Sequence, residues 1–459
     1  MSAPGTPDRP LTVAVVGAGP SGFYAVEALL KAPGLTVRVD LFDRLPTPYG
    51  LVRGGVAPDH QKIKSVAAVY ERAALDPRVR FFGNVKLGRD LSVDDLRARY
   101  DQIVYAVGCE SDRRMDVPGE DLVGSHSATE FVGWYNGHPD HRHRSFDLSC
   151  AAAAVVGVGN VAMDVTRLLS CDAESLAKTD VAGYALDALR KSLVKTVWLL
   201  GRRGPAEAAY SPDEIEEIGE LPACDLVVDP AEAVVDEVSK AALSAPAVKR
   251  KVEYVQGRAK IGEGTKPRKV RLRFCVSPVE LIGEAGAVKA IKIERNKLVS
   301  DGKGGTKAVG AGKFETIPVG LVLRSVGYRG VPLPGVPFDE KSGHIPNAAG
   351  RVVPGEYVVG WAKRGPSGLI GTNRADSVAT VSAMLEDLKA GKLPARAVDT
   401  SIESMPKLLV AKGSKALSFA QWKELDKLEL AQGAAHGKIR EKFTRVEDML
   451  AALGARVPT

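Results

Sequence analysis

Two short apolar runs along this chain each end in a glycine-rich turn and lead into a segment with helical periodicity. The first reads Val-Ala-Val-Val-Gly-Ala-Gly-Pro-Ser-Gly over 13–22, and the second reads Ala-Val-Val-Gly-Val-Gly-Asn-Val-Ala over 154–162. A continuous apolar run bounded by turn residues predicts a strand that is buried on both faces, as in a parallel sheet. Each run therefore predicts the strand, turn and helix that open a doubly wound α/β domain.

Two more apolar strands, 101–108 and 321–327, also end in a small residue and a glycine. We interpret them as matched crossings between two domains, because a glycine at a strand end lets the backbone approach a neighbour closely. The second domain is then an insertion in the first. The predicted boundaries give a first domain in two parts, 1–108 and 326–459, and an inserted domain, 109–325.

The remaining pattern fills in the elements between these motifs. Apolar runs predict buried strands, helical periodicity predicts helices, and alternation of apolar and polar residues predicts antiparallel strands. The expected strands are 36–42 and 196–200, the helices 63–74, 161–170 and 375–388, and the antiparallel strands 269–276 and 288–293. We expect an extra helical excursion over 172–193, an exposed hairpin tip over 301–313, and helices with charged faces near the C-terminus.

The residue at the end of the next strand indicates which dinucleotide each turn binds. Asp43 follows the first turn by about twenty residues, and a carboxylate there suits the free 2′-hydroxyl of FAD or NAD. Arg202 and Arg203 follow the second turn, and paired guanidiniums suit the 2′-phosphate of NADP(H). The chain is therefore predicted to hold FAD and NADP(H) together and to transfer electrons.

The amino-acid composition indicates whether the chain itself contains an electron acceptor besides the flavin. The five cysteines are scattered and form no Cys-x-x-Cys pair, which excludes a redox disulfide and an iron–sulfur cluster within the chain. No metal is expected, since neither the cysteines nor the seven histidines have metal-ligand spacing. The electrons are therefore expected to leave to a separate molecule. The net charge of +7 either steers an anionic partner or reflects ordinary solvated surface.

The chain shows no sign of a nucleic-acid or membrane partner. It has no long Lys/Arg run or aromatic-basic motif, and no apolar stretch near the ~20 residues that span a bilayer. Residues 1–10 are polar and Pro-rich, and they resemble neither a secretory signal nor an amphipathic presequence. We therefore expect a cytoplasmic protein.

Three long motifs resemble the adrenodoxin reductase family, most of all its bacterial NADPH–ferredoxin reductases. They are LPTPYGLVRGGVAPDH at 45–60, GRRGP at 201–205 and GWAKRGPSGLIGTN at 360–373. The resemblance implies two Rossmann-like domains of the glutathione-reductase type, with the NADP domain inserted into a discontinuous FAD domain. It also implies an FAD-dependent NADPH:ferredoxin oxidoreductase. We expect a monomer that serves an acidic ferredoxin of the 2Fe-2S, 3Fe-4S or 4Fe-4S type.

The resemblance also assigns roles to individual positions. Besides Gly17, Gly19 and Gly22 of the first fingerprint, the matching FAD contacts are Ser21, Asp43, Leu51, Leu87, Trp361, Gly368, Leu369 and Ile370. The matching NADP contacts are Arg113, Val158, Gly159, Asn160, Val161, Arg202, Arg203, Glu214 and Gly368. The candidate catalytic residues are His60 and Glu214, which match a pair near the nicotinamide and flavin, and Asp164, one helical turn beyond Asn160.

Two positions depart from the family pattern, and three have plainer interpretations. Asp43 stands where relatives often carry Glu, and its shorter side chain is expected to weaken or reroute the ribose contact. Val158 stands where relatives carry Asn or Gln, so a side-chain bond is lost there although the backbone N–H groups remain. His60 is alternatively a helix-capping residue, Glu214 a surface helix residue, and Trp361 ordinary core packing.

Three functions remain open from the sequence. The first is the ferredoxin–NADP+ reductase, with Lys249, Arg250, Lys251 and Arg258 as candidate docking positions for the acidic partner. The second is an electron-input subunit that resembles the small subunit of glutamate synthase. Those relatives carry a cysteine-rich segment before the first fingerprint, and this chain has none. The third is a flavin-binding scaffold or redox sensor.

Overall fold

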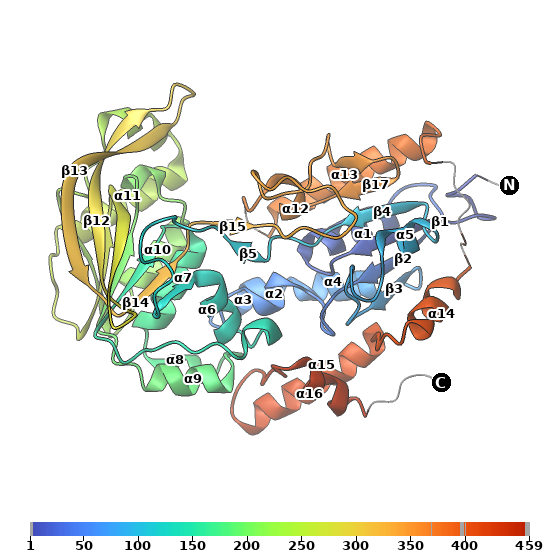
Figure 1. The fold of residues 1–459 in the computed structure, drawn as a ribbon, viewed down its shortest axis with the longest axis horizontal. Helices are drawn as coiled ribbons and strands as arrows, with labels where there is room; N and C mark the ends of the chain where they lie inside the picture. The colour runs from blue at the N-terminus through green and yellow to red at the C-terminus, as the bar shows by residue number, and fades with distance from the viewer. Residues whose placement is uncertain (1–2, 369, 395–398, 400, 455–459) are drawn as a thin grey trace. The chain divides into compact units, whose positions relative to one another are not determined.

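The computed structural model describes residues 3–368, 370–394, 399 and 401–454. The chain forms two compact units: unit 1 comprises Met1–Ser111 with Gly327–Thr459, and unit 2 comprises Asp112–Val326. In Figure 1, the blue start and the orange-to-red end of the chain belong to unit 1, and the green and yellow middle belongs to unit 2. Unit 1 is therefore formed by both ends of the chain, and unit 2 by its middle.

Unit 1 is organised around a six-stranded sheet with the order β16–β17–β4–β1–β2–β3. Neighbouring strands are parallel, except that β16 and β17 are antiparallel. Every residue of β1 is buried, as the apolar run predicts for a central strand of a parallel sheet. The strands are β1 (Leu11–Val16), β2 (Val37–Phe42), β3 (Val79–Phe82), β4 (Gln102–Tyr105), β16 (Arg351–Val353) and β17 (Glu356–Val358).

Helices from both parts of the chain complete unit 1. The first helix, α1, packs against α4 and against α13, so the two chain segments share one hydrophobic core. These helices are α1 (Pro20–Leu30), α2 (Leu51–Gly54), α3 (Gln61–Lys64), α4 (Ala67–Ala74), α5 (Val93–Arg97), α12 (Trp361–Arg364), α13 (Thr372–Lys389), α14 (Ser404–Ala411), α15 (Phe419–Ala435) and α16 (Val446–Ala452). The short strands β5 (Ser111–Asp112) and β15 (Tyr328–Arg329) mark the two places where the chain passes between units.

Unit 2 contains a second six-stranded sheet, β6–β14–β7–β8–β10–β9, in which all neighbouring strands are parallel. Its strands are β6 (Ser125–Ser127), β7 (Ala152–Val156), β8 (Thr196–Leu200), β9 (Cys224–Val228), β10 (Arg268–Arg273) and β14 (Leu321–Arg324). Its helices are α6 (Ala128–Tyr135), α7 (Asn160–Ser170), α8 (Ala173–Leu176), α9 (Gly183–Arg190), α10 (Pro212–Gly219) and α11 (Pro246–Ala259), with 3-10 turns at Pro139–His141, Pro205–Glu207 and Glu237–Ser244. The parallel α/β prediction is thus confirmed in both units.

A three-stranded antiparallel sheet, β11 (Val276–Glu284), β12 (Ala287–Ser300) and β13 (Thr306–Pro318), adds to unit 2. The predicted hairpin tip at 301–313 was too long, because β13 already pairs with β12 from Thr306 onward. The first half of β13 is rich in Gly and Lys, residues that are typical of loops, so the sequence pattern did not indicate a strand there. The predicted helix over 63–74 is likewise divided into α3 and α4.

The prediction of an antiparallel strand at 269–276 was wrong. Most of this segment is β10, a parallel strand between β8 and β9. Its polar residues suggested a half-exposed strand, but acidic neighbours cover them. Lys269 pairs with Asp225 at 2.7 Å, and the buried Arg273 pairs with Glu232 at 2.9 Å. The charged side chains of β10 therefore interact with acidic residues of unit 2 and not with solvent, so their polarity does not mark an exposed face.

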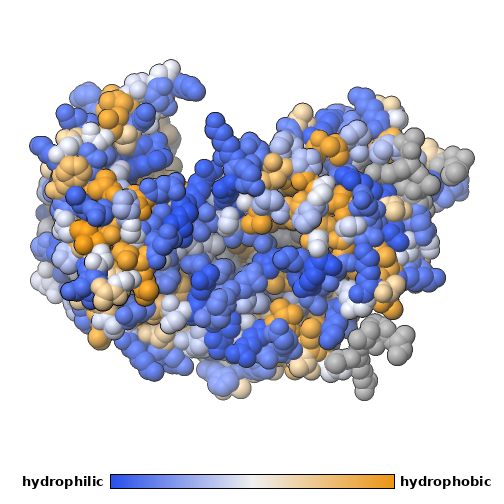
Figure 2. Space-filling model, in the orientation of Figure 1, coloured by the Kyte–Doolittle hydropathy of each residue, from blue (hydrophilic) through white to orange (hydrophobic). Residues whose placement is uncertain are grey.

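The surface drawn in Figure 2 is mainly hydrophilic, and its hydrophobic residues lie scattered among polar ones. None of the helices in the described part of the chain combines the length and the apolar character needed to cross a membrane.

A buried carboxylate ties the C-terminal helices to the segment that follows the first glycine turn. Glu429 on α15 is fully buried and pairs with Arg53 of α2 at 2.5 Å and with Arg440 at 2.8 Å. The backbone N–H of Phe443 donates to the same carboxylate at 3.0 Å. The Arg53 guanidinium also lies 5.0 Å from the centre of the Trp422 ring. Glu429 thus fixes α15 against α2 through Arg53, and it shares Arg440 with Asp426, which lies 2.6 Å from that guanidinium.

We predict that Glu429→Gln destabilises the protein by about 3 kcal/mol, the lower end of the cost of breaking a buried ion pair, because the half-buried Arg53 loses its carboxylate whereas Arg440 keeps Asp426. Chemical denaturation measures this loss. Glu424→Gln is the matched control on the same helix: its side chain is 60% exposed and pairs with Lys427, so it is expected to cost less than about 1 kcal/mol. Equal effects of the two substitutions would contradict the structural role of Glu429.

Candidate functional site

The two glycine turns have the same backbone geometry in both units. Gly17 has a φ of +112° and Gly157 a φ of +125°, values that L side chains rarely adopt. A Cβ on Gly17 would lie 2.4 Å from the carbonyl oxygen of Ala106, and one on Gly157 would lie 2.2 Å from that of Ser325. Each turn therefore requires glycine for its conformation and for its contact with the neighbouring chain.

The helices that follow these turns begin without side-chain caps. Gly19 is the N-cap of α1 and Gly159 that of α7, and neither helix has an acidic residue in its first turn. Apart from its own chain neighbours, no described residue has an atom within 4 Å of the Cβ position of Gly159, which leaves open space beside this backbone. The first-turn N–H groups and the positive helix dipole therefore favour an anion. Both helix ends fit the pyrophosphate of a dinucleotide.

Asp43 follows β2, as the sequence predicts, but its carboxylate also shapes the glycine turn. The N–H groups of Ala18 and Leu45 each donate to it at 2.9 Å. Burial raises the pKa of Asp43 to about 6, although these two backbone hydrogen bonds oppose the shift. Each carboxylate oxygen has further lone-pair capacity for a ribose hydroxyl. The turn-shaping role was not included in the sequence-based interpretation.

A second segment of unit 1, which begins at Gly360, lies against the first fingerprint. A Cβ on Gly360 would lie 2.0 Å from Ser21 Oγ, so these distant parts of the sequence are neighbours. Trp361 follows, with its ring centre 5.3 Å from that of Tyr328. Its indole Nε1 is buried and has no hydrogen-bond partner among the described residues. Other buried polar atoms of the described residues, such as Trp422 Nε1, share this state, and a bound polar cofactor is one way to satisfy such a donor.

The other positions expected to contact FAD differ in how far they are exposed to solvent. Leu51 begins α2 and is 37% exposed, whereas Leu87 is buried. Gly368 has a φ of +77°, and Ile370 packs against the hydrophobic core of unit 1. Leu369 lies outside the described residues. Their contacts with FAD stay predictions.

In unit 2, the second fingerprint is tied to the loop before α10. The carbonyl oxygen of Val158 accepts hydrogen bonds from the N–H groups of Ala209 at 2.9 Å and Tyr210 at 3.1 Å. Asn160 Oδ1 accepts one from the N–H of Ser211 at 2.9 Å. Val161 is half-buried in the first turn of α7. Backbone contacts therefore hold this turn although Val158 offers no polar side chain.

The arginine pair after β8 has the charge that a 2′-phosphate needs. Arg202 is exposed and Arg203 half-buried. Within the described ranges, neither guanidinium makes a hydrogen bond or an ion pair with another residue. Two adjacent cations without protein partners present their charge to an external anion. Arg113, the other expected NADP contact with a positive charge, is also exposed in unit 2.

Asp164 and Glu214 are brought together by a residue that the sequence-based interpretation missed. Arg167 on α7 is buried, and its guanidinium lies 2.6 Å from Asp164 and 3.1 Å from Glu214 of α10. Glu217 adds a third carboxylate at 3.5 Å. Glu214 is 8% exposed, so the interpretation as a surface residue was wrong. The i, i+3 spacing of Asp164 and Arg167 was the available signal.

His60 lies immediately before α3, but its imidazole does not cap this helix. Its backbone carbonyl oxygen does so instead and accepts hydrogen bonds from the N–H groups of Ile63 at 3.1 Å and Lys64 at 3.3 Å. His60 is thus the N-cap residue of α3, as the alternative interpretation expected, but through its backbone alone, and its catalytic role stays a prediction.

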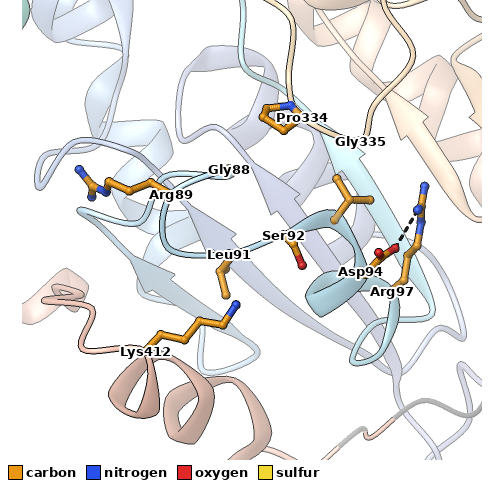
Figure 3. Close-up of a pocket in the computed structure, with 10 residues that line it drawn as sticks. Gly88, Arg89, Leu91, Ser92, Asp94, Arg97, Pro334, Gly335 and Lys412 are labelled. Carbon is orange, nitrogen blue, oxygen red and sulfur yellow. Dashed lines mark hydrogen bonds and ion pairs between the residues drawn. The ribbon is translucent and has the colours of Figure 1, made fainter.

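A separate cavity of about 370 Å³ in unit 1 carries basic side chains, but acidic neighbours neutralise them. Figure 3 shows Arg97 beside Asp94, at 3.0 Å, and Lys412 pairs with Asp95 at 2.5 Å. We therefore assign no anionic ligand to this cavity. Its lining consists of Gly88, Arg89, Leu91, Ser92, Val93, Asp94, Arg97, Pro334, Gly335 and Lys412.

Proteins similar to this chain match it over nearly its whole length. NADPH-ferredoxin reductase FprA of Mycobacterium tuberculosis is 45% identical over 453 residues, which cover 96% of this chain and 99% of FprA. The mitochondrial NADPH:adrenodoxin oxidoreductase of Homo sapiens is 40% identical over 463 residues, which cover 98% and 93% of the two chains. The chain belongs to the adrenodoxin reductase family.

The solved structure of M. tuberculosis FprA in complex with NADPH shares this fold. Its TM-score is 0.92 at 44% identity, and the match covers 97% of this chain and 100% of FprA. The predicted fold class, with two Rossmann-like domains, is thereby confirmed. No family model matches the chain.

The raised pKa of Asp43 predicts a pH-dependent stability. Because its folded pKa of about 6 exceeds the ordinary value of 3.8, the folded state binds more protons than the unfolded state between these values. The free energy of unfolding therefore falls as the pH rises through this window. Asp43→Asn removes this titration, so the variant does not share the loss of stability. The free energy of unfolding of the variant minus that of the parent protein should therefore rise from about pH 4 to about pH 6 and then level off. Chemical denaturation across this range, without added nucleotides, measures the difference; a flat difference would contradict the assignment.

Proposed function

We propose that this chain is an FAD-dependent ferredoxin–NADP+ reductase, which oxidises NADPH and passes single electrons to a ferredoxin-type iron–sulfur protein. The observation that carries the proposal is the pair of uncapped glycine turns, one followed by Asp43 and the other by Arg202 and Arg203. Relatives that match nearly the full chain are named for NADPH together with ferredoxin or adrenodoxin. The family and the charges at the two turns therefore support the same function.

Unit 1 is the part of the chain that fits FAD. The N-terminus of α1 would hold the pyrophosphate, Asp43 the ribose, and Trp361 with the backbone of 368–370 the flavin ring. When bound, FAD supplies the step between two-electron hydride transfer and one-electron transfer. The buried, unpartnered indole Nε1 of Trp361 supports this placement.

Unit 2 is the part that fits NADPH. The N-terminus of α7, with Gly159 and Asn160, would bind the pyrophosphate through backbone N–H groups. Arg202 and Arg203 would bind the 2′-phosphate, and Arg113 would add a further positive charge. A phosphate in this position receives charge-assisted hydrogen bonds that a free 2′-hydroxyl does not, so NADPH is favoured over NADH.

His60, Glu214 and Asp164 are the proposed catalytic residues. Hydride transfer depends on orientation of the reacting rings and exclusion of water more than on a strong acid or base. Glu214, which pairs with Arg167 at 3.1 Å, would accept a hydrogen bond from the nicotinamide carboxamide. His60 would position water near the reacting rings or tune the flavin electrostatically.

The proposed partner is an acidic ferredoxin, since a net charge of +7 steers an anionic protein toward this chain. Two of the four expected docking positions do not serve this purpose. Lys251 is buried and donates a hydrogen bond to the carbonyl oxygen of Ala208, and Arg250 is paired with Glu216. The attraction is therefore proposed to come from the overall field and not from a basic stripe along α11.

A monomeric reductase is proposed over the alternative of an electron-input subunit in a larger complex. The chain matches 99% of the length of FprA, which carries the name of a reductase. Native mass measured in a cell extract distinguishes the two: the reductase has the mass of one chain, whereas the subunit travels with a larger enzyme.

The double variant Arg202→Ala/Arg203→Ala tests the proposed function. Each charge-assisted phosphate contact contributes roughly 1.5–3 kcal/mol, so we expect the KM for NADPH to rise ~100-fold or more. The kcat should change less, and the kinetic constants with NADH should change little. Steady-state reduction of ferredoxin with each nucleotide gives this comparison.

The matched control for this experiment is Arg190→Ala. Arg190 is also an arginine of unit 2 with a partly exposed side chain, but it pairs with Glu174 at 2.7 Å. Its loss should leave the preference for NADPH unchanged. An unaltered NADPH/NADH preference in the double variant would overturn the assignment of unit 2.

A further inference from the structure

The side chains of the arginine pair have no protein partners within the described ranges, so the backbone must determine where they point. Ordering a flexible side chain on binding costs about 0.5–1.5 kcal/mol, and a mobile loop adds to that cost. A loop held in its binding conformation avoids part of this loss. The contacts that fix the backbone of Arg202 and Arg203 are therefore relevant to the choice of nucleotide.

Both backbone carbonyl groups of the arginine pair accept hydrogen bonds from the antiparallel-sheet region of unit 2. Nδ2 of Asn296, on β12, donates to the carbonyl oxygen of Arg202 at 2.9 Å. The N–H of Cys275, the residue just before β11, donates to the carbonyl oxygen of Arg203 at 3.0 Å. The N–H of Asn296 in turn donates to the carbonyl oxygen of Cys275 at 2.7 Å. The two donors are thus connected to each other as well as to the pair.

The Asn296 side chain is itself fixed in direction. Its Nδ2 also donates to Ser277 Oγ on β11 at 2.8 Å, so both amide hydrogens are used. The pairing of β12 with β13 shifts register between Glu294 and Asn296. Such an irregularity re-aims the side chain next to it. Here the re-aimed side chain meets the backbone of the arginine pair.

We propose that Asn296 is a positioning residue for nucleotide choice, which holds the backbone of Arg202 so that the arginine pair is pre-ordered for a 2′-phosphate. This inference rests on the proposed function, because it takes the arginine pair as the 2′-phosphate site. Asn296 acts through the pair and need not touch the nucleotide. Its loss should therefore weaken recognition of the 2′-phosphate selectively and leave binding of the rest of the nucleotide intact.

The test uses the full-length flavoprotein and two probes that differ in one phosphate, adenosine 2′,5′-bisphosphate and AMP. Asn296→Leu keeps the approximate size of the side chain but removes both donors. We expect the Kd of the bisphosphate, measured by calorimetry, to rise about three- to tenfold, which corresponds to the loss of one hydrogen bond. The Kd of AMP should stay the same, whereas general damage to unit 2 would weaken both probes.

A second variant keeps the test decisive if Asn296→Leu fails to fold. Ser277→Ala removes the hydroxyl that orients the amide of Asn296, and it should shift the ratio of the two Kd values in the same direction by a smaller factor. Ser300→Ala, at the exposed end of β12, the strand that carries Asn296, is the control and should leave the ratio unchanged.

The outcomes separate this inference from the proposed function. If Arg202→Ala/Arg203→Ala abolishes the preference for the bisphosphate while Asn296→Leu and Ser277→Ala retain it, the positioning role is wrong and the arginine site stands. If the double arginine variant also keeps the preference, the 2′-phosphate site is wrong and the role of Asn296 fails with it.

Discussion

The contact between each glycine turn and the chain just beyond a neighbouring strand is the constraint on which both units depend. In unit 1 the N–H of Ala106 donates to the carbonyl oxygen of Val16, and in unit 2 the N–H of Ser325 donates to that of Val156, each at 2.7 Å. These hydrogen bonds leave no room for a Cβ on the first glycine of either turn. The turn must then lead directly into a helix, whose N–H groups remain for an anion.

The two units differ in the charge placed beside this shared turn. In unit 1, the carboxylate of Asp43 is held by backbone N–H groups and belongs to the turn itself. In unit 2, Arg202 and Arg203 have no side-chain partner among the described residues, and their backbone is held from the antiparallel region. A carboxylate next to the ribose repels a 2′-phosphate, whereas two guanidiniums attract one. The same turn thus supports different nucleotides in the two halves of one enzyme.

Local sequence patterns were sufficient to predict the strand–turn–helix units, strand 196–200 and the two residue types beside the turns. The strand–turn–helix units and Asp43 depend on neighbours within about twenty residues, the spacing of the dinucleotide fingerprint, whereas the arginine pair follows its turn by about forty because a helical segment over 172–193 intervenes. The parts that were missed depend on long-range partners. The polar residues of β10 are covered by Asp225 and Glu232, and Arg167 gathers acidic residues from α10. Asn296 reaches the arginine pair from a strand ninety-four positions later in the chain. No periodicity in the sequence records such pairings.

The most direct test of the account is an anaerobic optical titration of the purified protein with NADPH, followed by oxidised ferredoxin. The account predicts a bound flavin whose absorbance NADPH bleaches, NADH at the same concentration leaves largely unchanged, and oxidised ferredoxin restores. A protein that binds no flavin, or a flavin that NADPH does not reduce, would contradict the central claim that one chain joins an FAD site to an NADPH site for electron transfer.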